Sequence, residues 1–487
     1  MKISFENSYA ALPERFYAHV APSSAEAPQL IKLNNALAEE LGLDPEWLRS
    51  PEGAEFLSGK KIASGSQPIA TAYAGHQFGS FVPQLGDGRA VLLGEIVDPQ
   101  GSRRDIQVKG AGRTPFSRGG DGKAALGPVL REYVLSEAMA ALGIPTTRAL
   151  AVLTTGQQVL RERTLPGAVI VRVASSHIRV GTFQYFAARN DKEALRLLAD
   201  HVIERHYPVF GERRYRALLD SVIAAQAKLI AQWMTVGFIH GVMNTDNSAI
   251  SGETIDYGPC AFMDTYDPAA VFSSIDRQGR YAYANQPQIG LWNLSRFAET
   301  LLPLLNDDQD GAVAEAEEAL DAFAPRFQSE YTNGFRRKLG LSTEVEGDDD
   351  LIRGLLGAMA GNQVDFTLFF RRLADAIEPG ADEPARELFV NPLEFDHWAV
   401  KWRARLQLEV RDISAARTAM LAINPAYIPR NHRIEAMIEA AVDEEDFGPF
   451  EELAQLLSRP FDEQPQFQRY QNPPKPDERV LATFCGT

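Results

Sequence analysis

The hydrophobic pattern of this 487-residue chain changes from mainly strand-like to mainly helical near residue 183. Before that point, short runs rich in Val, Ile and Leu are separated by turn residues, as over 90–97, 105–109 and 168–174. After it, apolar residues recur at helical spacing, most clearly over 215–236. Strands followed by a long helical segment predict an α+β fold, in which a small β-rich lobe and a large helical lobe enclose a cleft.

Local signals predict further elements in the first part of the chain. Leucines and isoleucines at helical spacing predict a helix over 30–43. A second helix is expected over 129–142, because Gly143 and a nearby proline follow it as they follow many helix ends. Strands are expected over 149–153 and 158–162.

Turn and polar segments complete the expected organisation. Two β-like pieces, 248–250 and 254–256, flank Ser-Gly-Glu and predict a tight hairpin. The acidic run 346–350 is expected to form a solvated loop. The Pro- and Gln-rich stretch 464–479 is expected to lie extended over the surface.

The net charge of the chain limits the kinds of molecule that we expect it to bind. The chain has 49 Lys and Arg against 65 Asp and Glu, a formal net charge of −16. A field of that sign repels phosphate backbones and anionic lipids, so we expect neither nucleic acid nor membrane as a partner. No apolar run approaches the roughly 18 residues of a membrane helix, and the first residues lack the apolar core of a secretion signal. With two cysteines a disulfide framework is excluded, and we expect a cytoplasmic protein.

A glycine pair directly precedes the expected strand at residue 90. In Gly86-Asp87-Gly88-Arg89, the glycines would let backbone N–H groups approach a phosphate, and Arg89 would add charge. An ordinary β-turn is the alternative interpretation. The loop matches neither a Walker A sequence nor a dinucleotide-binding fingerprint, because a strand follows it.

A lysine and a glutamate then occur in a suggestive order. Lys109 ends the next strand, and Glu132 lies in the helix beyond a glycine-rich loop. Protein kinases hold the phosphates of ATP with a strand Lys paired to a helix Glu. Two unrelated surface charges are the alternative, but the order of glycine loop, Lys109 and Glu132 favours a nucleotide site.

The segment from residue 240 to 256 carries candidate metal ligands. His240 and Asn247 stand seven residues apart, as in the kinase catalytic loop. Asn247 and Asp256 are oxygen donors that could share one Mg²⁺ bound to a nucleotide. Where a kinase has its catalytic Asp this chain has Val242, which cannot accept a proton, and Asp246 is the other carboxylate of the loop.

Several long motifs closely resemble the selenoprotein O family, known in bacteria as YdiU. The resemblance covers nearly the whole chain and implies a protein-kinase-like fold that binds ATP in reversed orientation and transfers AMP to protein hydroxyls. It implies an N-terminal extension over 1–65, a small lobe over 66–182, a helical lobe over 183–430 and a C-terminal extension over 431–487. The motifs are His76-Gln77-Phe78-Gly79, Gly86-Asp87-Gly88-Arg89, the stretch 109–118, Arg131-Glu132-Tyr133, the stretch 243–247, the stretch 256–260 and Arg430-Asn431-His432.

The resemblance also implies roles for individual residues. It implies Asp246 as the proton acceptor, Asn247 and Asp256 as ligands of Mg²⁺ or Mn²⁺, and an ion pair between Lys109 and Glu132. The expected partners are ATP and proteins with Ser, Thr or Tyr hydroxyls, including the enzyme itself. The residues expected to bind the nucleotide are Gly86, Gly88, Arg89, Lys109, Asp121, Gly122, Arg172, Arg179 and Asp256.

The two cysteines suggest a reversible disulfide. Cys260 follows the Asp256 motif, and Cys485 lies near the end of the chain. A bridge between them would regulate access to the cleft, as the resemblance also suggests. Two unrelated free thiols are the alternative.

Three other functions stay open at this point. Relatives have been credited with UMP transfer from UTP under Mn²⁺. A kinase-type phosphotransfer could use Asp246 as a displaced base. A non-catalytic nucleotide-binding scaffold is the third, although both metal-ligand types are retained.

Overall fold

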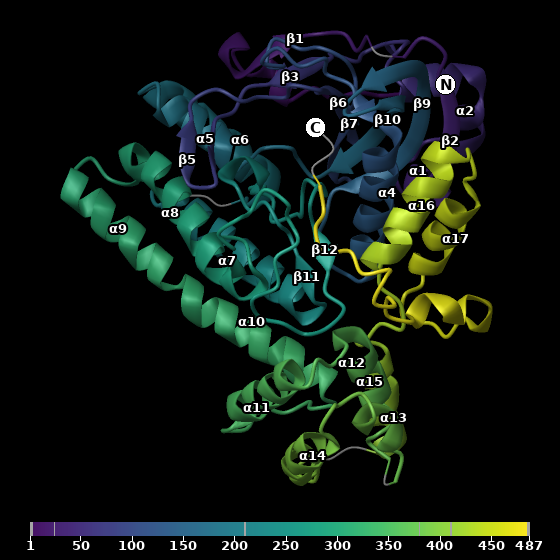
Figure 1. Cartoon of the computed structure of the whole chain (residues 1–487). Helices are drawn as coiled ribbons and strands as arrows, with labels where there is room; N and C mark the ends of the chain where they lie inside the picture. The colour runs from purple at the N-terminus through teal and green to yellow at the C-terminus, as the bar shows by residue number, and fades with distance from the viewer. Residues whose placement is uncertain (1–2, 24, 209–210, 379, 410–411, 485–487) are drawn as a thin grey trace.

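An antiparallel sheet and a helical region make up the molecule in the computed structural model (Figure 1), which describes residues 3–23, 25–208, 211–378, 380–409 and 412–484. The sheet has the strand order β1-β3-β6-β7-β10-β9-β2, and β8 pairs with β10. The prediction that the chain combines strands and helices is confirmed, and the sheet is antiparallel. The strands of this sheet are β1 (Tyr17–His19), β2 (Gln29–Leu33), β3 (Ile69–Thr71), β6 (Ala90–Val97), β7 (Arg103–Lys109), β8 (Ala124–Ala125), β9 (Arg148–Leu160) and β10 (Thr164–Ala174).

Helices cover both faces of this sheet. Alternate residues of a strand point to opposite faces, and in β10 Val171 packs toward the helices that precede β3, whereas Ile170 packs toward α4. On the second face α4 lies beside α16 and α17, which come from the far end of the chain (Figure 1). The first group is α1 (Asn35–Glu40), α2 (Pro45–Arg49) and α3 (Pro51–Leu57), and the second is α4 (Leu126–Ala141), α16 (Asn431–Asp443) and α17 (Gly448–Leu457).

The helical region follows the sheet and is built around α7, which packs against α8, α9 and α10. None of the helices in the described ranges is long and apolar enough to cross a bilayer. Two short hairpin-like sheets, β4 (Gly75–Gln77) with β5 (Ser80–Val82) and β11 (Phe238–Ile239) with β12 (Ala261–Phe262), complete the strands. The helices are α5 (Val180–Ala187), α6 (Lys192–His206), α7 (Arg214–Thr235), α8 (Gln286–Leu305), α9 (Gln309–Asp321), α10 (Phe323–Lys338), α11 (Asp348–Gly361), α12 (Phe366–Leu373), α13 (Glu383–Arg386), α14 (Pro392–Leu406) and α15 (Ile413–Leu421).

The helix predicted over 30–43 is wrong in its first half. Residues 29–33 form β2, which pairs with β9 and places Leu33 opposite Ala151. The helix starts after Asn34, whose side chain accepts a hydrogen bond from the Leu37 amide at 3.1 Å. This N-cap sets the boundary, and the long-range pairing with β9 outweighs the local helical spacing.

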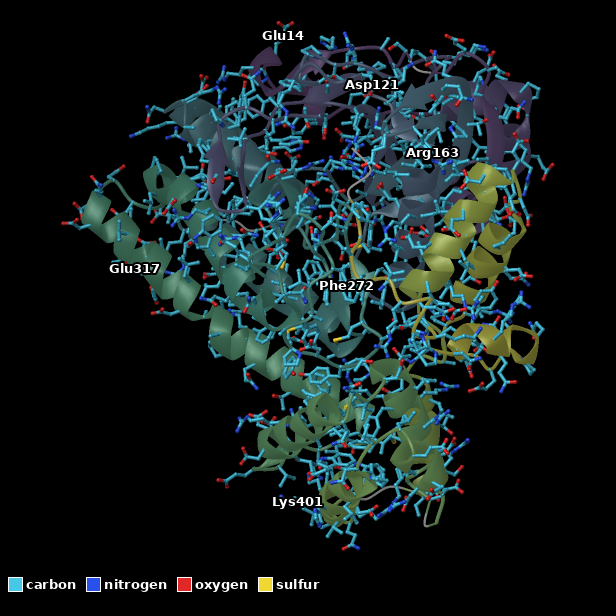
Figure 2. All side chains as sticks on the ribbon, viewed as in Figure 1. Glu14, Asp121, Arg163, Phe272, Glu317 and Lys401 are labelled. Atoms are coloured by element: carbon cyan, nitrogen blue, oxygen red, sulfur yellow. The ribbon has the colours of Figure 1, made fainter. Side chains whose placement is uncertain are left out.

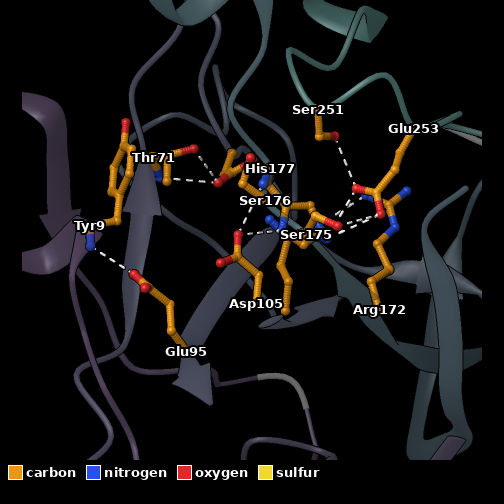
Figure 3. Close-up of polar contacts among 12 residues, drawn as sticks. Tyr9, Thr71, Glu95, Asp105, Arg172, Ser175, Ser176, His177, Ser251 and Glu253 are labelled. Atoms are coloured by element: carbon orange, nitrogen blue, oxygen red, sulfur yellow. Dashed lines mark hydrogen bonds and ion pairs between the residues drawn. The ribbon is translucent and has the colours of Figure 1, made fainter. Parts of the chain in front are cut away.

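The hairpin predicted over 248–256 does not form. Ala249 instead bridges to Arg179, and Thr254 bridges to Thr146. The turn is held elsewhere: the Glu253 carboxylate accepts hydrogen bonds from the Ser175 amide at 3.0 Å and from the Ser175 hydroxyl at 2.9 Å (Figure 3). The segment is thus fastened to the end of β10, and its two halves do not pair with each other.

Three other predictions need correction. The acidic run 346–350 is only partly a solvated loop, because α11 begins at Asp348 and this carboxylate is buried beside Arg405, 2.7 Å from its Nε. The two strands predicted over 149–153 and 158–162 are one continuous strand, β9. The stretch 464–479 begins with a short 3-10 helix, Pro465–Gln471, which buries Phe467.

Arg430 fastens the last part of the chain to the helical region. Its side chain is 1% exposed, and its Nη1 lies 2.9 Å from a carboxylate oxygen of Asp365. The same guanidinium contacts Asp264 and donates to the Gln471 carbonyl at 3.1 Å. One buried cation therefore joins the segment after β12, the start of α12 and the C-terminal stretch.

Candidate active site

Glu132 holds two cations at the centre of the site. Lys109, the last residue of β7, has its Nζ 2.7 Å from Glu132 Oε2, and Arg172 of β10 donates from Nε to Glu132 Oε1. The register of β10 against β7 explains why both side chains reach Glu132. Arg172 pairs with Gln107, which lies two residues before Lys109, so Arg172 and Lys109 lie on the same face of the sheet, the one that α4 covers. All three side chains are buried or nearly so.

These charges shift one another's pKa values. Burial alone would raise the pKa of Glu132, but Arg172 and Lys109 lower it to about 2. Burial lowers the pKa of Lys109, and Arg172 lowers it further. The glutamate therefore stays ionised and keeps the two cations in fixed positions.

A cavity of about 190 Å³ opens beside this cluster. Arg89, Lys109, Glu132 and Asp256 line it together with Phe484 of the C-terminal segment. The Asp256 carboxylate lies 3.7 Å from Lys109 Nζ. Burial would raise the pKa of Asp256, but Lys109 and Arg172 hold it well below the usual range. Asp256 also has a φ of 69°, a left-handed conformation that is uncommon for a non-glycine residue.

The loop after β11 presents Asn247 in a fixed orientation. Asn247 donates its side-chain amide to the Val242 carbonyl at 3.1 Å, which leaves the amide oxygen for another partner. The His240 ring accepts from the Val242 amide at 3.3 Å and lies 3.0 Å from the Ile255 carbonyl. His240 thereby links this loop to the residue before Asp256.

Asp246 is buried and has few partners. Its Oδ2 accepts a hydrogen bond of 3.3 Å from Gln77, and its Oδ1 has no partner among the described residues. Gly75 lies so close that a Cβ there would be 2.4 Å from Oδ1. Burial raises the pKa of Asp246 to about 6. A carboxylate in this state is poorly solvated and can accept a proton readily.

Arg179 belongs to a second cluster and not to that of Arg172. Its Nη1 donates to the Asp246 backbone carbonyl at 3.0 Å, and its Nη2 lies 3.6 Å from Asp87. The guanidinium also stacks over the Tyr73 ring at 4.3 Å. Asp87 thus connects the loop 86–89 with the loop that carries Asp246.

The remaining predicted residues do not line the cavity but lie in the chain shortly before Arg89 and Ala124, which do. At Gly86 a Cβ would lie 2.3 Å from the Phe116 ring, and at Gly88 it would lie 2.9 Å from the Phe116 carbonyl. Asp121 (Figure 2) pairs with Arg161 at 2.8 Å, and that side chain lowers its pKa. Gly122 has a φ of 71° and accepts a hydrogen bond of 3.0 Å from the Gly112 amide, which closes the glycine-rich loop.

Asn247 and Asp256 each carry an oxygen donor of the kind that suits a hard cation which a nucleotide helps to bind. The described residues contain no group of three His, Cys, Asp or Glu placed to hold a metal. Asn247 offers an amide oxygen and Asp256 an ionised carboxylate. Mg²⁺ typically takes one or two protein oxygens and completes its shell with substrate phosphates and water.

Cys260 is fully buried, and burial raises the pKa of its thiol to about 12. Its predicted disulfide partner, Cys485, lies outside the described residues. The Thr483 hydroxyl donates to the carbonyl of Pro259 at 2.5 Å, and the Thr483 amide donates to the carbonyl of Phe272 (Figure 2) at 2.6 Å.

Sequence reasoning assigned no role to Gln77, Gly75 or Asp87, although each contacts Asp246 or Arg179. The first two lie in or beside the His76 motif, and Asp87 lies in the glycine loop. These residues therefore belong to, or adjoin, motifs that stand out in the sequence. No pattern in the sequence, however, indicates that residues 75–87 lie close to the loop that carries Asp246.

Comparison with known proteins points to the same nucleotide chemistry as the charged side chains at the cavity. The family described as protein adenylyltransferase SelO matches residues 1–458. The chain belongs to the SelO family. It is similar to the protein nucleotidyltransferase YdiU of Bradyrhizobium sp. (strain BTAi1), with 66% identity over 485 residues and 99% of each chain covered. The YdiU proteins of Rhodopseudomonas palustris (strain BisB5) and of Methylorubrum extorquens are 64% and 62% identical, again over 99% of each chain.

We expect Glu132→Gln to destabilise this SelO-family protein, because two buried cations lose their counter-charge. Removing one partner of a buried ion pair typically costs about 3–5 kcal/mol. The folded-state pKa of about 2 lies below the ordinary 4.5, so the contribution is complete above pH 4.5 and is lost as the pH falls toward 2.

Urea unfolding of both forms at neutral and at acidic pH measures this difference. Glu317→Gln, at an exposed position of α9 (Figure 2), is the matched control. Equal unfolding free energies of wild type and Glu132→Gln at neutral pH would contradict the interpretation.

Proposed function

We propose that this protein transfers AMP from ATP to Ser, Thr and Tyr hydroxyls of proteins, itself included, and releases pyrophosphate. The observation that carries the proposal is the charge arrangement at the cavity. Lys109 and Arg172 are fixed by Glu132, and the ionised Asp256 faces Lys109. Such an arrangement suits a polyphosphate with its cation, in a chain that matches adenylyltransferases over 1–458.

The proposed architecture is a kinase-like pair of lobes. The small lobe would span 66–182 and the helical lobe 183–430, with extensions over 1–65 and 431–487. The cavity is in line with this division, because Lys109 comes from the sheet and Asp256 from the segment after α7. The first extension also supplies β1 and β2 to the sheet.

Binding would use both clusters. Lys109, Arg172 and Arg89 would hold phosphates at the cavity, and Arg179 would act beside Asp246. The loops of Gly86, Gly88, Asp121 and Gly122 would close over the nucleotide. Asn247 and Asp256 would hold Mg²⁺ or Mn²⁺, which would neutralise charge on the phosphates.

The transfer step needs one proton acceptor. The acceptor hydroxyl oxygen attacks the α-phosphorus, the bond from that phosphorus to the bridging oxygen breaks, and pyrophosphate leaves. The hydroxyl proton passes to Asp246, because Val242 has no acceptor group. The burial and unpartnered Oδ1 of Asp246 support this role.

The position of the label in the product decides between AMP transfer and its rivals. With ATP labelled in parallel at the α- or γ-position, we expect protein-bound α-label, a mass gain of one AMP and released pyrophosphate. Asp256→Ala should lose this signal without unfolding, whereas Asp350→Ala, whose side chain is 80% exposed, should keep it.

Incorporation of γ-label alone would establish a kinase and overturn the proposal. Binding without incorporation of either label would leave a scaffold. A parallel reaction with α-labelled UTP and Mn²⁺ measures UMP transfer.

Gly75→Ala should slow the transfer through Asp246. The new Cβ would lie 2.4 Å from Asp246 Oδ1, so the carboxylate must move. A displacement of about 1 Å at a reacting group can cost about 100-fold in rate, and we expect kcat to fall by that order. Gly354→Ala is the control, since nothing lies within 4 Å of a Cβ there. An unchanged kcat in Gly75→Ala would remove Asp246 from the reaction.

We also propose a reversible disulfide between Cys260 and Cys485 that restricts the cavity. The hydrogen bond from Thr483 to Pro259 supports it, since both residues lie close in sequence to the cysteines. Phe484 also lines the cavity, so a fixed tail would obstruct it. Activity should rise on reduction in the wild type and not in Cys260→Ser. Equal rates and equal mobility on non-reducing gels in the wild type would exclude the bridge.

A further inference from the structure

Three arginines surround the β4–β5 hairpin. Arg280 lies 4.8 Å and Arg296 5.3 Å from the centre of the Trp292 ring, measured from each Cζ. Arg189 donates to the carbonyl of Pro83, the residue directly after β5, at 3.1 Å. Stacking on a tryptophan holds a guanidinium in place while its N–H groups stay available.

These arginines have few acidic partners, although the protein as a whole is acidic. The chain carries 65 acidic against 49 basic residues. Across the described ranges, Arg189 and Arg280 form no ion pair, although many other arginines do, such as Arg172 and Arg430. Arg296 pairs with Glu299, which is 52% exposed. Of the three arginines, only Arg296 therefore has an acidic partner within ion-pair distance in the described ranges, and the Asp276 carboxylate next to Arg280 accepts backbone amides instead.

Aromatic side chains lie between the arginines. The His76 ring lies 4.9 Å from Phe81 and 5.2 Å from Trp292. Phe81 itself, the middle residue of β5 and the partner of His76 in the register, is 40% exposed. We call the surface formed by Phe81, Arg189, Arg280, Trp292 and Arg296 the hairpin collar.

The hairpin that carries the collar rests directly on the loop of Asp246. The His76 amide donates to Thr245 Oγ1 at 2.7 Å, and the Phe78 amide donates to Asn244 Oδ1 at 3.0 Å. Between them, Gln77 contacts Asp246. A polypeptide held on the collar would thus lie within a few residues of the proposed proton acceptor.

We propose that the hairpin collar binds an acidic segment of the acceptor protein, beside the hydroxyl that receives the nucleotide. This inference rests on the proposed function and adds the substrate class. Carboxylates pair with arginine in bidentate geometry, and Phe81 offers an apolar contact for a neighbouring side chain. A basic segment would be repelled. Under the proposed function the nucleotide phosphates would have other cations, Lys109 and Arg89 at the cavity and Arg172 beside Glu132.

Fluorescent peptides test the collar without any need for catalysis. One peptide carries a single Tyr with two Asp on each side, and its partner carries Asn at the same four positions. By anisotropy, wild type should bind the Asp peptide about tenfold more tightly, the size of one or two charge-assisted hydrogen bonds. The preference should weaken with added salt.

Substitutions of the collar arginines test whether the collar causes the preference for the Asp peptide. Arg280→Gln should remove it by weakening the Asp peptide alone, and Arg280→Glu should reverse it toward a Lys peptide. Arg189→Gln, at an exposed position, serves as a second variant should Arg280 variants unfold. Arg353→Gln is the control, because Arg353 is 76% exposed on α11 and pairs with Asp350.

Transfer kinetics then separate the two proposals. With α-labelled ATP, the Asp peptide should show a lower KM and a similar kcat, and Arg280→Gln should raise that KM. Equal affinity of wild type for the Asp and Asn peptides would overturn the collar, whether or not label is transferred. A binding preference without any α-label would overturn the adenylyltransferase and leave the collar standing.

Discussion

The carboxylate of Glu132 is the contact on which the rest of the site depends. It is a buried side chain of α4 that contacts Lys109 from β7 and Arg172 from β10, so it joins one helix to two strands. Two buried cations without it would repel each other across a medium of low polarity. With Glu132 in place, Lys109 can also face Asp256. The cavity is then lined by the cation of Lys109 and by the carboxylate of Asp256.

A second polar centre is built from four distant parts of the chain. Asp246 lies between Gln77 and Gly75 on one side and Arg179 on the other, and Arg179 reaches back to Asp87. The hairpin of β4 and β5 therefore serves two purposes. Its inner residues support the loop that carries Asp246, and its outer surface carries the collar to which we assign the acceptor protein.

Much of the fold follows from local pattern. The strand over 90–97 and the long helix near 215–236 were predicted within one residue, because alternation and helical spacing are local properties. The failures share a cause. Residues 29–33 pair with β9, and Glu253 bonds Ser175, so partners far away in sequence overrode the local preference. Asp348 looked solvated for the same reason, since its partner Arg405 lies 57 residues away.

The amino-acid sequence specifies the available chemistry: which cations, carboxylates and amides this protein can use, and their order along the chain. Lys109, Glu132, Asn247 and Asp256 stand out by type and order alone. Which of these side chains come into contact depends on how the chain folds. Arg172 and Arg179 are seven residues apart, yet one pairs with Glu132 and the other lies beside Asp246. β10 ends at Ala174, and the chain turns before α5 begins. The side chains of Arg172 and Arg179 therefore extend in different directions. Gly75 likewise gains its importance from a close approach across 171 residues, which depends on folding and not on neighbours in sequence.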